Sequence, residues 1–311
     1  MSCPSAGMGA GAGDGEVLSG QAPAKINLYL EVLGRRTDGF HELLTVLQTI
    51  DLCDEITVRL RDRREHIAPG EPDVSLDLVT SCPGDTGPAQ HVPRGPDNLV
   101  LRAASALLTE CGAGGEVGLS LELTKGIPAG GGLGGGSSDA ALTLTLLDRL
   151  LGAPLGPSAL HRLAAQLGSD VPFFLTGGTA LCSGRGEIVQ PIDGPEPFDL
   201  LLHLPGFGLS TPTVYRALNA EPLRTQPDSH HAHLISAFDD APTTTLERLY
   251  RNDLEAPALR SEPRLASMLN QGGFHLSGSG STLFRLCPDP TDETPSEETS
   301  GQFVRTVSRT R

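Results

Sequence analysis

The sequence lacks the features that mark disulfide-stapled, zinc-binding and membrane-spanning proteins. It has six cysteines in 311 residues, with no C-x-x-C pair and no spacing typical of a metal site. No apolar run approaches the roughly 18 residues that a spanning helix needs. Tryptophan is absent and tyrosine occurs three times, so aromatic side chains are scarce for any binding site that would use them.

Basic residues are also few. Lys and Arg number 23 against 38 Asp and Glu, which gives a formal net charge of −15 at pH 7. Such a balance repels phosphate backbones and anionic lipid surfaces, so we expect neither a nucleic-acid partner nor a membrane partner. Together with the unpaired cysteines, these features predict a cytoplasmic protein of one large or two ordinary domains.

The two ends of the chain differ in composition from the part between them. Residues 1–20 are rich in glycine and have neither the basic nor the apolar region of a targeting segment. Residues 288–311 are polar and rich in Pro, Ser, Thr and Glu, a composition that does not form a packed core. We therefore predict a disordered leader over 1–20, a folded part over 21–287 and a disordered tail over 288–311.

The folded part mixes strands and helices in irregular order. Alternating apolar residues predict strands over 24–32, 54–60, 75–81, 116–124 and 198–205. Apolar periodicity and cap residues predict helices over 97–111, 138–151, 157–168, 211–218 and 252–260, with a strand-turn-strand over 274–286. This order favours an α+β fold. In the first strand, alternation places Lys25 and Asn27 on one face and four apolar residues on the other, namely Ile26, Leu28, Leu30 and Val32.

The stretch KGIPAGGGLGGGSSDAA, which begins at Lys125, places six glycines directly before a predicted helix. It matches G-x-G-x-x-G, a weak signal of a dinucleotide site. A dinucleotide fold would have an acidic residue about twenty positions further on, and the region near residue 155 has none. The G-K-[ST] ending of a Walker loop is also absent. What remains is a general anion site, because glycines let backbone N–H groups converge on a phosphate at a helix N-terminus.

The order of five motifs resembles the GHMP kinase superfamily. The motifs are PAKINLYLEVLGRRTDGFHEL, IPAGGGLGGGSSDAA, GSDVPFF, RNDLE and LSGSGSTLF, and they span about residues 23–284. The first motif is similar to that of the superfamily's 4-diphosphocytidyl-2-C-methyl-D-erythritol kinases, which act in the non-mevalonate isoprenoid pathway. The resemblance implies an ATP-binding domain over 21–190, a substrate-side domain over 191–287 and an active site in the cleft between them. It also implies ATP with Mg²⁺ as donor and the C2 hydroxyl of the substrate as acceptor.

The resemblance also implies roles for individual residues. Asp170 by itself is equally well explained as a turn residue, and Lys25 as a solvated lysine; the family pattern makes them the catalytic base and its cationic partner. The expected ATP-binding residues are Gly130, Gly131, Gly132, Leu133, Gly134, Gly135, Gly136, Ser137, Ser138 and Asn98, the last of which is equally suited to cap its helix. The expected substrate-binding residues are Asn27, Phe40, His41, Thr211 and Tyr215, with Phe40 and Tyr215 stacking on cytosine and His41 bonding its edge.

Some alternatives stay open at this point. A homoserine or mevalonate kinase would share the glycine loop without the aromatic clamp, and a non-catalytic nucleotide-binding relative or a dinucleotide-dependent oxidoreductase would belong to another class. We expect a small-molecule substrate, a monomer or weak homodimer, and no dedicated metal ligand. The segment SHHAH at 229–233 looks metal-binding, but we predict a solvated loop there.

Overall fold

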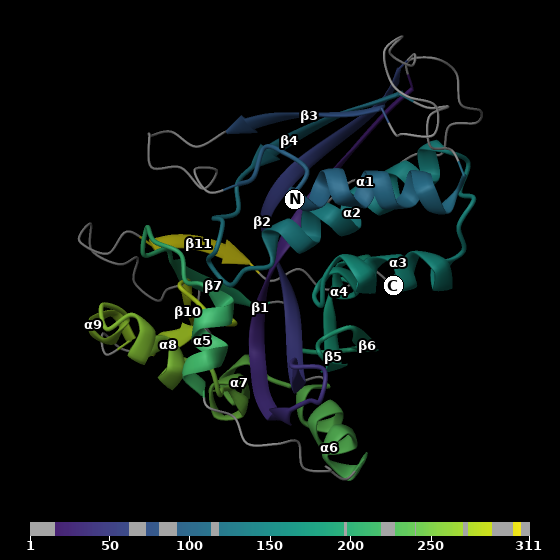
Figure 1. Ribbon diagram of the computed structural model, residues 1–311. Coiled ribbons are helices and arrows are strands. Elements are labelled where there is room, and N and C mark those ends of the chain that lie inside the picture. The colour runs from purple at the N-terminus through teal and green to yellow at the C-terminus, as the bar shows by residue number, and fades with distance from the viewer. Residues whose placement is uncertain are drawn as a thin grey trace.

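The computed structural model describes residues 16–61, 73–80, 92–112, 118–195, 198–218, 228–239, 241–269, 273–287 and 301–305. The described residues form two sheets with helices packed beside them (Figure 1). The mixture of helices and antiparallel strands confirms the predicted α+β class. No helix in these ranges is long and apolar enough to cross a membrane.

The larger sheet is built around two long strands. They are β1 (Val17–Arg35) and β2 (His41–Arg61), which pair antiparallel along most of their length. Around them lie β3 (Asp73–Thr80), β4 (Gly118–Lys125) and the two-residue β8 (Arg251–Asn252), in the order β3-β4-β2-β1-β8. Two further strands, β5 (Thr179–Gly184) and β6 (Ile188–Ile192), extend the sheet beside the N-terminal part of β2.

Four helices cover this sheet on one side (Figure 1). They are α1 (Leu99–Glu110), α2 (Gly135–Leu150), α3 (Pro157–Leu167) and α4 (Val171–Thr176). Their buried side chains and those of β2 and β4 make one continuous apolar cluster, which fixes the start of α2 relative to the strands. Helices α1 and α3 lie within the predicted ranges 97–111 and 157–168.

The smaller sheet has the order β11-β7-β10-β9. Its strands are β7 (Asp199–His203), β9 (His275–Leu276), β10 (Leu283–Cys287) and β11 (Gly301–Arg305). The helices of this part are α5 (Thr211–Leu218), α6 (Asp228–Phe238), α7 (Thr243–Leu249), α8 (Glu255–Ser261) and α9 (Leu265–Leu269). Strands β9 and β10 pair antiparallel, which confirms the strand-turn-strand predicted over 274–286.

The side chains of strand β1 exchange faces halfway along its length. Its register with β2 shifts between Asn27 and Tyr29, as at a β-bulge. Ile26 and Leu28 therefore pack between the two sheets, whereas Leu30 packs against α5 and α8. The prediction of a single apolar face from 26 to 32 is wrong beyond Leu28, because a bulge changes which side chains point to each face.

The folded part extends beyond both of its predicted ends. Val17–Gly20 belongs to β1 and pairs with β2, so the leader cannot extend to residue 20. Gly301–Arg305 forms β11 and pairs with β7, which contradicts a disordered tail over the whole of 288–311. Both segments are joined through main-chain hydrogen bonds, which a polar sequence makes as well as an apolar one. The remaining residues of the predicted leader and tail lie outside the described ranges.

The histidine-rich segment is helical. The residues SHHAH at 229–233 lie within α6, so the prediction of a loop is wrong. His230 Nε2 lies 2.8 Å from Glu31 Oε2 on β1. Among the described residues, no group of three or more His, Cys, Asp or Glu side chains is placed to hold a metal ion.

Candidate active site

The glycine loop between β4 and α2 is packed too closely for side chains. Gly132 has φ +77°, and a Cβ atom there would lie 2.2 Å from the carbonyl oxygen of Ser277 in the β9–β10 turn. The same turn binds the loop through Thr282 N to Gly131 O, at 3.0 Å, and Ser277 Oγ to Gly132 O, at 3.2 Å. The loop is therefore a fixed backbone surface, held against the LSGSGSTLF turn between β9 and β10.

Helix α2 begins at Gly135, three residues before its predicted start. Gly134 takes the left-handed conformation at the N-cap, φ +70°, which lets Gly135, Gly136 and Ser137 form the first turn. The N–H groups of a first helical turn have no partner within the helix and carry a partial positive charge. The low helix propensity of glycine concealed this turn in the sequence.

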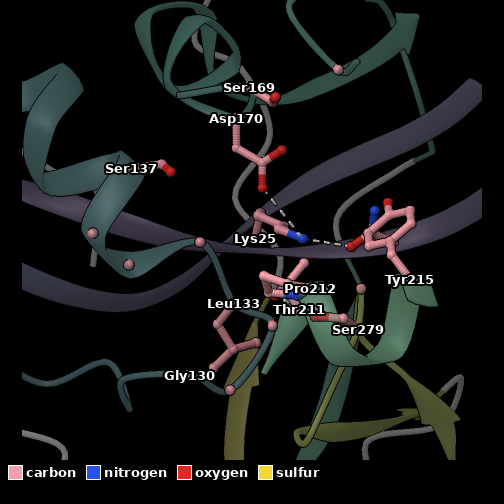
Figure 2. A pocket seen from close by; sticks show the side chains of 18 of the residues that line it. Lys25, Gly130, Leu133, Ser137, Ser169, Asp170, Thr211, Pro212, Tyr215 and Ser279 are labelled. Atoms are coloured by element: carbon pink, nitrogen blue, oxygen red, sulfur yellow. Dashed lines mark hydrogen bonds and ion pairs between the residues drawn. The ribbon is translucent and has the colours of Figure 1, made fainter. Parts of the chain in front are cut away.

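Lys25 and Asp170 point toward each other beside the glycine loop (Figure 2). Lys25 Nζ lies 3.8 Å from Asp170 Oδ2 and donates to Asn27 Oδ1 at 2.6 Å. The backbone N–H of Lys25 bonds Leu133 O of the glycine loop at 3.0 Å. Asn27 in turn donates to Thr45 Oγ1 at 2.9 Å. Lys25, Asn27 and Thr45 are thus joined by hydrogen bonds, and Lys25 adds an ion pair to Asp170.

The surroundings of Lys25 and Asp170 differ. Burial lowers the pKa of Lys25 below its ordinary value of 10.5, and the negative charge of Asp170 only partly offsets this effect. Asp170 stands before α4, yet its side chain makes no cap hydrogen bond, and 36 % of it is exposed. A carboxylate left free of local structural bonds, beside a buried ammonium, suits a group that accepts a proton from a ligand.

Three aromatic residues line a cavity together with Lys25 and Asp170. His41 and Tyr215 have ring centroids 4.9 Å apart, and Tyr215 extends from α5 (Figure 2). Phe40 is half exposed, with the Arg185 guanidinium 4.8 Å from its ring centroid. Thr211, at the start of α5, bonds the hydroxyl of Ser279 at 2.8 Å. The predicted clamp residues are therefore neighbours, though β1–β2 and α5 lie about 170 residues apart in the chain.

One cavity of about 970 Å³ joins these groups. Its lining includes all the site residues predicted from the sequence except Ser138. Ser138 is buried and is not among the lining residues, so the cavity gives no support to its predicted place in an ATP site. Asn98 caps α1 by accepting from Val100 N at 2.8 Å and also reaches Pro93 O at 2.7 Å. Its capping role is therefore confirmed.

A buried charged cluster beneath the glycine loop was missed by sequence reasoning. Lys125 at the end of β4 pairs with Asp54 on β2 and, at 2.8 Å, with Asp139 on α2. Asp54 Oδ1 also accepts the N–H groups of Gly126 and Ile127, at 2.6 and 2.8 Å. Burial, opposed by Lys125 and reinforced by Asp54, raises the pKa of Asp139 to about 8. The cluster joins both ends of the loop, and only the pairing of β2 with β4 places Asp54 beside Lys125.

Comparisons with known proteins show which family the chain resembles. Residues 98–178 match the model of the GHMP kinases N terminal domain. The chain is 39% identical over 278 residues to 4-diphosphocytidyl-2-C-methyl-D-erythritol kinase of Synechococcus sp. (strain JA-3-3Ab), covering 85% of this chain and 83% of the relative. It is 37% identical to the enzyme of the same name from Thermotoga maritima, covering 89% and 94%.

Solved structures give the same result. A crystal structure of 4-(cytidine 5'-diphospho)-2C-methyl-D-erythritol kinase superposes with a TM-score of 0.67 at 34% identity, covering 93% of this chain and 99% of that one. A homoserine kinase from Cytophaga hutchinsonii superposes with a TM-score of 0.63 at 18% identity, covering 94% and 95%. At that identity the second likeness shows the shared fold alone.

Proposed function

The chain belongs to the 4-diphosphocytidyl-2-C-methyl-D-erythritol kinases of the GHMP family, and on this premise we propose that Asp170 and Lys25 carry its phosphoryl transfer. It is an ATP-dependent kinase of an alcohol group, and its acceptor is the 2-hydroxyl of 4-diphosphocytidyl-2-C-methyl-D-erythritol. The observation that carries the residue assignment is the ion pair of Lys25 and Asp170 inside the cavity. The pair lies beside a glycine loop that opens onto the start of α2.

The glycine loop and the first turn of α2 hold the phosphates of ATP. The unpartnered N–H groups at the start of α2 point toward negative charge, and the helix dipole adds to the attraction. The close packing of Gly132 against the Ser277 carbonyl fixes the backbone before the nucleotide arrives. Little free energy is then lost in ordering the loop during binding.

Asp170 accepts the proton of the substrate hydroxyl as that oxygen attacks the γ-phosphorus. The new O–P bond forms while the bond from the γ-phosphorus to the β–γ bridging oxygen breaks, and ADP leaves with that oxygen. The Lys25 ammonium stabilises the charge on the transferring group. Asn27 holds the ammonium in place through its 2.6 Å bond. Positioning and charge account for most of such a reaction, because phosphoryl transfer needs little covalent participation by the protein.

The aromatic end of the cavity binds the cytidine. Phe40 and Tyr215 supply the two faces of a stacking clamp, and His41 supplies a polar edge for the base. In the structure Tyr215 packs on His41 and Phe40 packs on Arg185, so cytosine exchanges these contacts for its own. Thr211 lies beside the clamp, where its hydroxyl reaches the diphosphate.

The donor set fits a magnesium ion that arrives with the nucleotide. No protein cluster suited to hold a metal lies within the described ranges, and Mg²⁺ commonly retains waters and binds substrate phosphates. The residues that hold the phosphates, at the glycine loop and Ser137, would therefore hold the ion indirectly. Bound Mg²⁺ neutralises charge on the β- and γ-phosphates.

The cytoplasmic location and the monomeric or weakly dimeric state of the protein stay predictions.

The test is ATP turnover by the full chain and by Asp170→Asn, with 4-diphosphocytidyl-2-C-methyl-D-erythritol as acceptor. Loss of the base is expected to reduce kcat by about 10²–10⁴, and the melting temperature shows how far the loss of the ion pair with Lys25 affects the fold. Glu110→Gln is the matched control, since it removes a carboxylate from the Arg162 ion pair outside the cavity. Turnover retained by Asp170→Asn would remove Asp170 from the mechanism. If the chain phosphorylates only homoserine or mevalonate, its assignment as a kinase stands and the cytosine clamp is rejected.

A further inference from the structure

The glycine turn between β9 and β10 determines the space around Lys25. A Cβ atom at Gly278 would lie 3.2 Å from Lys25 Nζ and 3.3 Å from Asn27 Oδ1. The turn therefore forms one wall against the two groups that were placed in the mechanism. A small displacement of Gly278 toward them would compress the pair, and a displacement away would admit water between Lys25 and the glycine loop.

Asn252 on β8 holds this turn with its side chain. Its Nδ2 donates to Leu276 O at 2.9 Å and to Gly278 O at 2.8 Å, while its Oδ1 accepts from Leu254 N at 2.9 Å. One amide thus uses both its N–H groups and its oxygen. A carboxylate of the same size would keep the bond to Leu254 but would lose both donors and repel the two carbonyl oxygens.

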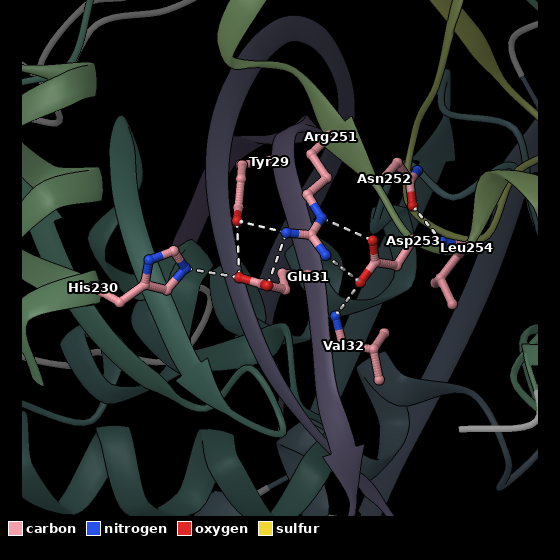
Figure 3. Close-up of polar contacts among 8 residues, drawn as sticks. All are labelled: Tyr29, Glu31, Val32, His230, Arg251, Asn252, Asp253 and Leu254. Carbon is pink, nitrogen blue, oxygen red and sulfur yellow. Dashed lines mark hydrogen bonds and ion pairs between the residues drawn. The ribbon is translucent and has the colours of Figure 1, made fainter. Parts of the chain in front are cut away.

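Strand β8 is fixed to the strand that carries Lys25. It pairs parallel with β1, with Leu30 opposite Asn252. Asp253 reinforces the pairing, because its N–H bonds Leu30 O at 3.0 Å and its Oδ2 accepts from Val32 N at 2.9 Å. Figure 3 shows Asn252 beside this network, facing away from Arg251 and Glu31. Asn252 therefore joins the position of the glycine turn to the position of β1.

We propose that Asn252 is a positioning residue for phosphoryl transfer, which holds Gly278 against Lys25 and Asn27 so that the ammonium stays aligned with Asp170. The inference rests on the proposed function of that pair. Asn252 belongs to the RNDLE motif and does not itself line the cavity. The proposal therefore gives this motif a part in the chemical step. Misplacement of a reacting group by about 1 Å can reduce a rate by about 10²-fold.

The experiment compares Asn252→Asp and Asn252→Ala with the wild type in the full chain. We expect kcat to fall about 10- to 100-fold in both variants, while the KM for ATP changes less than about threefold, because the loop keeps its own bonds to Ser277 and Thr282 of the turn. The matched control is Arg251→Met on the same strand. It removes bonds to Glu31 and Asp253 but leaves the β1–β8 pairing and Asn252 in place, so its kcat should stay within about twofold of the wild type.

Two further readouts separate positioning from general destabilisation and from a wrong function. Melting temperatures show whether Arg251→Met loses as much stability as the Asn252 variants. Hydrogen exchange of residues 276–282, measured without substrate, should increase in the Asn252 variants only. Unchanged kcat, or an equal fall in Arg251→Met, overturns the proposal. A wild type that phosphorylates no cytidyl acceptor overturns the proposed function instead, and the exchange measurement still tests the hold on the turn.

Discussion

The buried cluster of Asp54, Lys125 and Asp139 makes a specific prediction about charge. Asp54, Asp139 and Lys125 share a buried site at the wall of the cavity, with Lys125 and Asp139 only 3% exposed. Asp139 Oδ1 has no hydrogen-bond partner among the described residues, so a negative charge there is poorly stabilised. With a pKa raised to about 8, Asp139 is mostly protonated at pH 7. The cluster then contains one ion pair and one neutral acid.

Asp139→Asn should therefore be nearly neutral at pH 7. An amide has the size of the protonated acid and supplies the same donor and acceptor, so we expect a change in the free energy of unfolding below about 1 kcal/mol. Lys125→Met is the contrasting variant. It leaves the buried Asp54 charge without its ammonium, and breaking a buried pair in this way costs about 3–5 kcal/mol.

The pH dependence gives the sign of the effect. The folded pKa of Asp139, about 8, lies above its ordinary value of 3.8, so unfolding releases a proton between these values. Stability from this group is therefore lost as the pH rises toward 8, by at most about 1.4 kcal/mol per pH unit for one proton. Asp139→Asn cannot release that proton, so the stability of this variant relative to the wild type should rise steadily from pH 6 to pH 8.

Urea unfolding of the wild type, Asp139→Asn and Lys125→Met at pH 6, 7 and 8 measures these differences. The difference between wild type and Asp139→Asn cancels the other titrating groups, and it should change by about 2 kcal/mol over the two pH units. Parallel stability curves for the two proteins would refute the reasoning. They would mean that Asp139 is ionised and that the cluster carries a second negative charge.

Two further predictions concern the loop and the clamp. Gly132→Ala would place Cβ 2.2 Å from Ser277 O and should raise the KM for ATP at least about tenfold. Gly152→Ala is the control for backbone strain, because Gly152 has a similar φ but open space around it. This variant should leave the KM for ATP unchanged. Tyr215→Leu should raise the KM for the cytidyl acceptor about tenfold through the lost stacking while the KM for ATP stays constant; equal changes in both constants would contradict a clamp at Tyr215.

The class of fold followed from the order of the predicted strands and helices, and the candidate site residues came from short motifs that resemble a known family. The glycine loop, the Lys25–Asn27 spacing and the aspartate before α4 are local patterns, and each lies where its motif predicts a cavity residue. Helix caps such as Asn98 are also local, because the side chain bonds a backbone group two residues away. Ser138 shows the limit of this reasoning, because a helix that starts three residues earlier turns its side chain into the core.

The remaining features were decided by contacts between distant segments. The bulge at Leu28 depends on the register of β1 with β2, and the edge strand β11 depends on β7 offering free main-chain groups. Asp54 meets Lys125 across 71 positions, and Asn252 meets Gly278 through a strand of two residues. The sequence by itself determined which chemical groups are available and how neighbouring residues are spaced. Only the tertiary structure decided which groups lose water together, and burial lowers the pKa of Lys25 and raises that of Asp139.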